Sequence, residues 1–186
     1  MKKIILTVFA ASSLLLYSTQ AFALVNFSVG VPLSHTFTGK GVSGDDIESD
    51  GSPSGYFIQI GVPMLPGIGM DSYKTKVKCE GCDGDLHVAT TMYNLYYLLP
   101  IPIVNLTIGV GVGDTKYECS GNCSWQDGGT ATQWYTSIGV PIMPLFDLHL
   151  SYRSISSKIE ILTGSDKGKD GDVGGNVMGL GIGFNF

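Results

Sequence analysis

The chain ends in a segment in which apolar residues alternate strictly with small or polar ones. Residues 178–186 read Met-Gly-Leu-Gly-Ile-Gly-Phe-Asn-Phe. In a β-strand, this alternation places the apolar side chains on one face and the glycines on the other. A strand that closes on an exposed phenylalanine is unusual in a soluble sandwich. It is typical of a membrane barrel, in which lipid covers the apolar face.

The start of the chain predicts export. Two lysines precede an apolar stretch at 4–17, and Ala21-Phe22-Ala23 forms a small-x-small cleavage site. This is the layout of a secretory signal peptide, so we expect residues 1–23 to be removed and residues 24–186 to form one domain. The whole chain carries a formal net charge of −5, and loss of the two lysines makes it more negative. A negative charge argues against nucleic-acid binding.

Seven further segments alternate with the same period of two. Five are regular, near 25–34, 56–62, 104–113, 133–140 and 146–153, and two are less regular, near 67–77 and 87–99. Most are close to the 9–11 residues that a tilted strand needs to cross a bilayer, and beyond the signal no apolar run reaches the ~20 residues of a spanning helix. With the last segment, the pattern predicts eight membrane strands.

The connections between these segments alternate in length. Short proline turns near 63–66, 100–102 and 141–144 alternate with long hydrophilic stretches near 39–55, 78–86, 114–130 and 158–174. This predicts an all-β fold, an eight-stranded antiparallel up-and-down transmembrane β-barrel, with both termini on the short-turn side.

Charge is confined to the predicted loops and their shoulders. Only Asp71 and Asp147 among the acidic residues, and only Arg153 among the basic residues after the signal, lie elsewhere. Arg or Lys on the lipid face costs about 2–4 kcal/mol at mid-bilayer, so membrane strands should lack such charges. The candidates for the two interfacial aromatic girdles are Tyr93, Tyr97, Trp134, Phe146, Tyr152, Phe184 and Phe186.

The last strand carries glycine at the sixth position from the end and aromatics at the third and last, which are Gly181, Phe184 and Phe186. In this the chain resembles the small eight-stranded outer-membrane proteins of Gram-negative bacteria, such as the OmpA, OmpX and OmpW groups. Gly179 departs from the resemblance, because the signal usually begins with a polar residue there. The resemblance implies a cell outer-membrane location, contact with outer-membrane lipid and lipopolysaccharide, and recognition of these three residues by the barrel-assembly machinery.

Two smaller features add to this resemblance. The Tyr152-Arg153 step is similar to one that is common in the seventh strand of such barrels. Leu95-Tyr96-Tyr97 and the Pro-x-Leu-Pro turn are similar to an uncharacterised family of small outer-membrane barrels, which brings no activity with it.

The interior of an eight-stranded barrel is just wide enough for side chains to fill it, so a general diffusion porin is not expected. Strand parity directs Asp71, Asp147, His149 and Arg153 inward, on two strands that face each other across the lumen. Charges in so narrow a space need partners. We interpret these four residues as a polar plug; a proton or ion path is the alternative.

His149 and Ser151 also allow a catalytic interpretation, because a family of lipid A deacylases uses a His-x-Ser pair on a small barrel and histidine can act as general base. Both residues face the lumen, whereas an acyl chain would arrive from the lipid side. They also lie near the third short turn, away from the outer leaflet, without a carboxylate at a comparable level. We therefore predict no enzyme and keep lipid A modification as a remote alternative.

The cysteines form two close pairs in the second and third long loops, Cys79 with Cys82 and Cys119 with Cys123. Such spacings can hold zinc. In the oxidising exterior an even number of cysteines favours disulfides, and the short separations favour local pairing, with inter-loop pairing left open. The acidic loops at 45–50 and 166–172 lack EF-hand spacing, so no metal or other cofactor is predicted.

Two function classes remain. The first, which we favour, is a non-enzymatic surface barrel whose disulfide-stiffened loops bind an extracellular ligand or reinforce the envelope. The second is a narrow channel for small solutes, hydrophobic ones included, for which a strand break at Pro32 would provide a lateral opening.

Overall fold

The computed structural model describes residues 25–41, 44–62, 64–78, 85–101, 104–120, 128–143, 145–160, 168 and 170–186. The strands within these ranges are β1 (Asn26–Phe37), β2 (Ser54–Gly61), β3 (Pro66–Val77), β4 (Asp85–Ile101), β5 (Val104–Ser120), β6 (Gly128–Met143), β7 (Phe146–Glu160), β8 (Asp170–Asp172) and β9 (Gly175–Asn185). The signal peptide predicted at 1–23 lies outside the described residues. Within those residues, no helix is long and apolar enough to cross a membrane.

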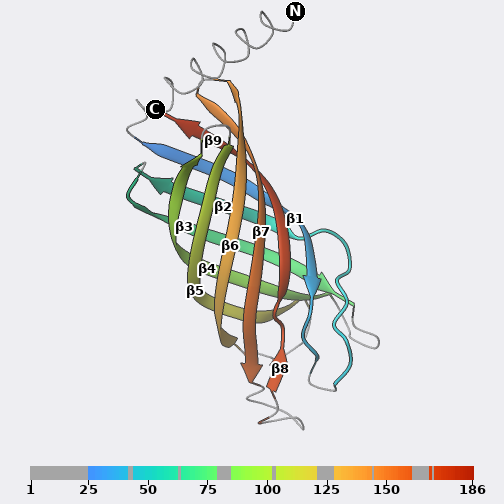
Figure 1. Cartoon of the computed structure of the whole chain (residues 1–186). Coiled ribbons are helices and arrows are strands. Elements are labelled where there is room, and N and C mark those ends of the chain that lie inside the picture. Colours follow the sequence, from blue (N-terminus) through green and yellow to red (C-terminus); the bar gives the residue numbers. More distant parts are fainter. Residues whose placement is uncertain are drawn as a thin grey trace, which may run out of the picture.

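The strands form one antiparallel sheet that closes on itself (Figure 1). Successive strands pair from β1 to β7, and β9 pairs with both β7 and β1. β8 continues the line of β9 along β7, so the wall has eight strand positions. Two backbone hydrogen bonds of 2.9 and 3.0 Å join Val25 to Phe186 at the short-turn end. The predicted eight-stranded up-and-down barrel is confirmed.

Several strands extend farther than the sequence predicted. β4 and β5 pair over 17 residues, from Asp85–Ser120 to Ile101–Val104. The predicted loop at 114–130 is therefore wrong at both ends, since 114–120 belong to β5 and 128–130 to β6. The predicted loop at 158–174 likewise contains the end of β7 and all of β8. Ladder hydrogen bonds do not require lipid, so paired strands continue beyond the apolar part of the wall wherever both partners continue.

Buried and exposed side chains alternate along each strand. In β6, Trp134 and Ile138 are about half exposed, whereas Gln133 and Tyr135 are buried. The exposed outer face is made of large apolar residues, which include Val29, Val31, Ile58, Ile60, Ile108, Val110, Val112, Ile138, Val140, Leu148, Leu150, Leu180 and Ile182. A continuous apolar face of this extent requires a cover of lipid.

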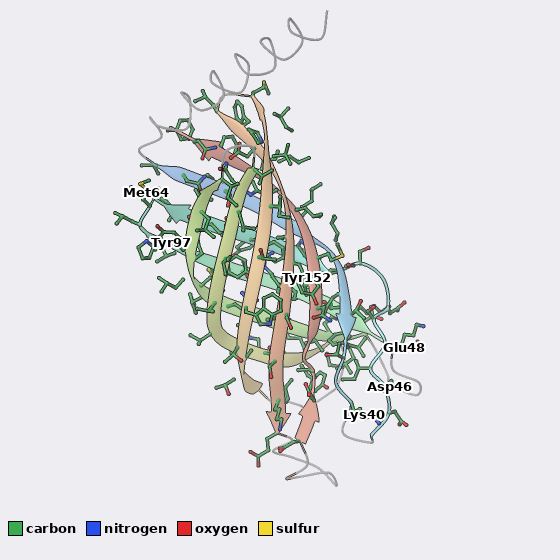
Figure 2. The ribbon with its side chains drawn as sticks, viewed as in Figure 1. Lys40, Asp46, Glu48, Met64, Tyr97 and Tyr152 are labelled. Atoms are coloured by element: carbon green, nitrogen blue, oxygen red, sulfur yellow. The ribbon has the colours of Figure 1, made fainter. Side chains whose placement is uncertain are left out.

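The predicted girdle aromatics lie on this outer face. Tyr93, Tyr97, Trp134 and Phe186 are exposed, and Phe146, Tyr152 and Phe184 are half-buried. The rings of Trp134 and Tyr152 lie 5.8 Å apart. Tyr97 lies toward the short-turn end and Tyr152 near the middle of the wall in Figure 2.

The wall is not uniformly closed. β1 pairs with β9 along its whole length, but with β2 only from Asn26–Gly61 to Gly30–Phe57. Beyond that point Ser54–Tyr56 pairs with β3 alone, and residues 48–50 continue along β3 through a bridge between Ser49 and Val77. We call the unpaired part of the β1–β2 boundary, residues 31–37 and 54–56, the seam.

Two local features accompany the seam. Pro32 has no N–H to give to a ladder, and the register between β1 and β9 shifts between Pro32 and Ser34. Gly55 has a φ of 149°, which favours glycine, and a Cβ there would meet the backbone of Ser72 and Tyr73. The predicted irregularity at Pro32 therefore coincides with the place where β1 and β2 part.

Candidate functional site

The lumen holds the polar residues that the sequence singled out. Its short-turn end is closed by a carboxylate and three asparagines. Asp147 accepts hydrogen bonds from Asn105 Nδ2 at 2.5 Å and from Asn185 Nδ2 at 2.7 Å, and Asn26 Nδ2 donates to Asn185 Oδ1 at 2.7 Å. The two donors to this carboxylate on β7 come from β5 and β9, and Asn26 on β1 holds the amide of Asn185 in turn. The carboxylate is 2% exposed, so it needs these donors.

His149 lies just above this floor and makes only loose contacts. Its Nε2 is 3.9 Å from Asp147 Oδ2, and its Nδ1 is 3.4 Å from Ser137 Oγ. A carboxylate that orients a catalytic histidine lies within about 3.2 Å of the ring nitrogen. Ser151, the serine of the catalytic interpretation, instead donates to the carbonyl of Gly179 and accepts from Arg153. These contacts are typical of side chains that fill the lumen, and the described residues around His149 and Ser151 do not form a hydrogen-bonded Ser-His-carboxylate triad.

The centre of the lumen holds a buried ion pair. Arg153 Nε lies 3.0 Å from Asp71 Oδ2, and its Nη2 lies 3.3 Å from Asp71 Oδ1. Both side chains are almost fully buried, at 2% and 0% exposure. Gln133 Nε2 donates to the same carboxylate at 2.7 Å and to Asn94 Oδ1. The two oxygens of Asp71 therefore have three donors, which is the arrangement that a buried charge pair requires.

Aromatic rings enclose the arginine. Its guanidinium carbon lies 3.4 Å from the ring centroid of Phe57 and 5.1 Å from that of Tyr135. Tyr135 Oη accepts a hydrogen bond from Gln59 at 2.8 Å. Glycines on other strands make room for both rings, because a Cβ at Gly109 would overlap Tyr135 and one at Gly179 would overlap Phe57.

The long-loop half of the lumen contains two apolar layers, with buried polar side chains such as Thr75 and Ser157 beside them. A first layer of buried side chains includes Tyr73, Met92, Ala131, Ile155 and Val177. Between the layers, His35 Nδ1 and Thr75 Oγ1 lie 2.8 Å apart. A second layer, which we call the apolar seal, consists of Phe37, Val77, Val88, Ile159 and Val173. Ile47 and Tyr117 pack against it, so a residue of the first long loop contributes to the closure.

The four predicted lumen residues are therefore all buried, but they form two separate pairs. Asp71 contacts Arg153 at the centre, while Asp147 and His149 lie at the short-turn end. Sequence reasoning missed the partners that satisfy these charges, among them Gln133, Asn94 and Asn105, and it missed the apolar seal. Period-two alternation was a usable signal for Gln133, Asn94 and Asn105, because each has the inward parity of its strand.

A small cavity remains below Arg153. Its polar lining residues include Ser28, Gln59, Ser137, His149 and Ser151, and its volume of about 20 Å³ is enough for about one water molecule. His149 Nε2 has no hydrogen-bonding partner among the described groups. This cavity does not connect the two ends of the barrel as a pore would, since the ion pair and both apolar layers lie above it.

The long-loop rim carries ion pairs on its outer side. Lys74 contacts Glu118, Lys76 contacts both Asp50 and Asp85, and Lys78 contacts Glu48. The hydrogen bond from Lys74 lowers the pKa of Glu118 below its ordinary value. These groups are exposed, so each pair stabilises the fold only slightly.

The remaining predicted residues are placed as follows. Gly181 packs against the backbone of Val29 and Gly30 in β1. Phe184 lies within 6.2 Å of Phe27 and 5.2 Å of Phe146, ring centroid to ring centroid, and stacks on Phe186.

The cysteine predictions lie mostly outside the described residues. Cys119 is in β5 near its long-loop end, whereas Cys79, Cys82 and Cys123 lie outside the described ranges, so their pairing stays a prediction. Among the described side chains, no group of three or more His, Cys, Asp or Glu is arranged to hold a metal.

No protein-family model matches this sequence, and no curated protein matches it. Solved structures do. Neisserial surface protein A superposes with a TM-score of 0.58 at 15% identity, over 87% of this chain and 97% of that one. OprG of Pseudomonas aeruginosa superposes with a TM-score of 0.58 at 16% identity, over 88% of this chain and 96% of OprG. The outer membrane protein W of E. coli superposes with a TM-score of 0.53 at 13% identity, over 88% of this chain and 98% of that one. This chain has the fold of the small outer-membrane β-barrels. The fold and the apolar outer face of this barrel together indicate an outer-membrane location.

Proposed function

We propose that this barrel is a non-enzymatic outer-membrane protein that does not conduct solutes and acts through its long-loop end, at the cell surface. The filled lumen carries this proposal. The ion pair of Asp71 and Arg153 occupies the centre, and the apolar seal occupies the long-loop half. A solute would have to separate buried opposite charges and then displace a packed apolar cluster, and both steps are costly.

The two ends of the barrel support an external role. The exposed charged side chains of the described chain gather at the long-loop end, where Lys40, Asp46 and Glu48 are seen in Figure 2. β4 and β5 remain paired as far as Asp85 and Ser120, so the regular wall of the barrel continues into this end. Disulfides within the loops, between Cys79 and Cys82 and between Cys119 and Cys123, would stiffen the loop tips further. Such an end suits contact with lipopolysaccharide or with an extracellular ligand.

Conductance of the purified barrel in planar lipid bilayers tests this function. We expect no steady channel from the unmodified protein. Stable, solute-specific conductance would overturn the proposal. The enzyme alternative is tested separately by the mass spectrum of lipid A from cells that express the barrel, which we expect to remain unchanged.

The seam favours a second candidate, a lateral path for small apolar solutes. The cavity below Arg153 is lined by Gly30 and Phe57, the last pair that joins β1 to β2, so it lies beside the start of the seam. Replacement of Pro32 by valine would supply an N–H and a residue suited to a strand. If the seam conducts, vesicles that contain the barrel will take up an apolar fluorescent solute faster than empty vesicles, and P32V will slow that uptake. Equal uptake by empty vesicles would exclude this candidate.

We also propose that Gly181, Phe184 and Phe186 form the signal that the barrel-assembly machinery reads. Phe186 is exposed and makes only a stacking contact with Phe184 among its described ring contacts, so F186S should not disturb the barrel interior. We expect F186S to lower the amount of folded barrel in outer-membrane fractions, measured by the mobility difference between unheated and boiled samples. F146S, which removes another ring beside Phe184, is the matched control and should assemble better.

A further inference from the structure

The short-turn rim of the barrel is apolar, which is unexpected for turns surrounded by water. Met64 is 69% exposed and Ile142 is 63% exposed, and Leu65, Met143 and Leu145 are about half exposed. These residues belong to the first and third short turns. Both turns have the sequence pattern Ile-Gly-Val-Pro-x-x-Pro, at 60–66 and 138–144, and neither contains a charged residue. Pro63 and Pro144 lie outside the described residues.

The turn surface is continuous with the lipid-facing wall. In β6 the outward row passes from Trp134 through Ile138 and Val140 to Ile142 without a charged residue. In β2, Ile58 and Ile60 lead directly to Val62 and Met64, all of them exposed. An apolar face that starts in the bilayer and ends in the turn has no polar boundary at the place where the wall should leave the membrane.

The length of the wall supports the same conclusion. From Trp134 to Val140 the outward row covers six residue steps, which at ~3.3 Å per residue and a tilt of ~40° spans about 15 Å. The apolar band of an outer-membrane barrel is ~25 Å tall. The row ends at the exposed Thr132 on the long-loop side. The missing height must therefore come from the short-turn side, where Ile142 and Met143 extend the row.

Met64 provides a second, independent observation. The turn is closed by a hydrogen bond of 3.0 Å from Leu65 N–H to the carbonyl of Val62. Met64 has a φ of 67°, a left-handed conformation that glycine adopts freely and that a residue with a side chain adopts at a cost. A large apolar side chain is thus held, exposed, at a position where the backbone favours glycine.

We propose that the short-turn rim docks into the inner, phospholipid leaflet, with Met64, Leu65, Ile142 and Met143 in contact with acyl chains. A periplasmic protein partner would also cover apolar residues, but protein interfaces carry a polar rim around the apolar centre. The described parts of both turns offer no such rim and merge instead with the surface that lipid already covers. The barrel therefore lies deep in the membrane on its short-turn side.

Fluorescence quenching in vesicles tests this placement. The chain has two tryptophans, Trp125 and Trp134, and both are replaced by phenylalanine. Single tryptophans are then introduced as M64W or I142W, and as K158W at the opposite, charged end. Each folded variant is inserted into phosphatidylcholine vesicles made with or without brominated acyl chains. Only samples that show the unheated-versus-boiled mobility shift are measured.

We expect brominated lipid to quench M64W and I142W several-fold more than K158W, and aqueous iodide to give the reverse order. Two turn positions are used so that one variant that fails to fold does not end the test. Iodide quenching of M64W and I142W equal to that of K158W would overturn the proposal. It would mean that water surrounds the rim and that a protein has to cover it.

Discussion

The lumen is closed twice, by two regions that use opposite chemistry. In its centre, Arg153 and Asp71 are paired between aromatic rings and neutral amides. Nearer the long loops, the same space is closed by packed apolar side chains, which are Phe37, Val77, Val88, Ile159 and Val173. The central pair depends on each partner being present, because either charge alone is buried and uncompensated. The stability of the apolar seal depends on how completely its side chains fill the space. The loss of one side chain leaves a cavity, but the others stay in contact.

The largest effect is expected from breaking the central pair on one side only. R153M leaves the Asp71 carboxylate buried with Gln133 as its remaining donor. We expect the free energy of unfolding in lipid vesicles to fall by about 3–5 kcal/mol, measured by urea titration with the mobility shift as readout.

The double variant D71L/R153M is the control for this prediction. It removes both charges, so it should recover most of the lost stability. A double variant as unstable as R153M would show that packing against Phe57, and not charge compensation, governs this region.

A smaller loss is expected from the apolar seal. I159A removes a fully buried side chain from the cluster and should lower the free energy of unfolding by about 2–3 kcal/mol. I138A removes the same group from the half-exposed lipid face and should cost less, because lipid fills the space. Equal losses in I159A and I138A would mean that the seal is not tightly packed. The same urea titration provides the measurement.

The next loss of stability is expected when a glycine that leaves space for an aromatic ring in the central region is replaced. G109A would place a Cβ against the Tyr135 ring and should cost about 1–3 kcal/mol. G128A is the matched control, because a Cβ there meets only ordinary van der Waals neighbours. If G109A folds as stably as G128A, the Tyr135 ring moves easily and does not hold Arg153 in place.

The smallest effect is expected from an exposed ion pair at the rim, in contrast to the buried pair at the centre. Glu118 pairs with Lys74 at the rim, and the hydrogen bond from Lys74 lowers the pKa of Glu118 below its ordinary value of 4.5. The stabilisation is therefore present above pH 4.5 and is lost as the pH falls through the lowered pKa. K74M should raise the pKa of Glu118 toward 4.5, measured by NMR titration in lipid nanodiscs. An unchanged pKa would assign the shift to Lys116 instead.

Strand parity predicted which side of the wall most strand residues face. It placed Asp71, Asp147, His149 and Arg153 inside and Trp134 and Tyr152 outside, because a period of two fixes the face of the residues in an uninterrupted strand. It fails across the register shift in β1, beyond which His35 and Phe37 are buried. It did not predict which inward residues meet. That depends on the stagger between strands, which brings Arg153 to Asp71 and leaves His149 near Asp147.

The ends of the strands were the least predictable part. Polarity marked 114–120 as a loop, yet these residues continue β5 because Asp85 and its neighbours in β4 pair with them. Conversely, residues 31–37 continue β1 along β9 but have no β2 partner, since β2 starts only at Ser54 and the preceding residues bond to β3. Local pattern indicates that a strand can form, while pairing depends on where its neighbour lies.

The pairing of β1 with β9 completes the ring of strands, and two backbone hydrogen bonds bring Val25 beside Phe186 without a covalent bond. In a variant made without residues 1–24, a short peptide linker between Phe186 and Val25 would give a circularly permuted barrel, opened at a long loop, with the same wall. In that chain, Phe186 would keep its neighbours Phe184 and Val25 but would no longer be the last residue. Circular permutation therefore separates what the phenylalanine contributes to the wall from what it contributes as a chain end.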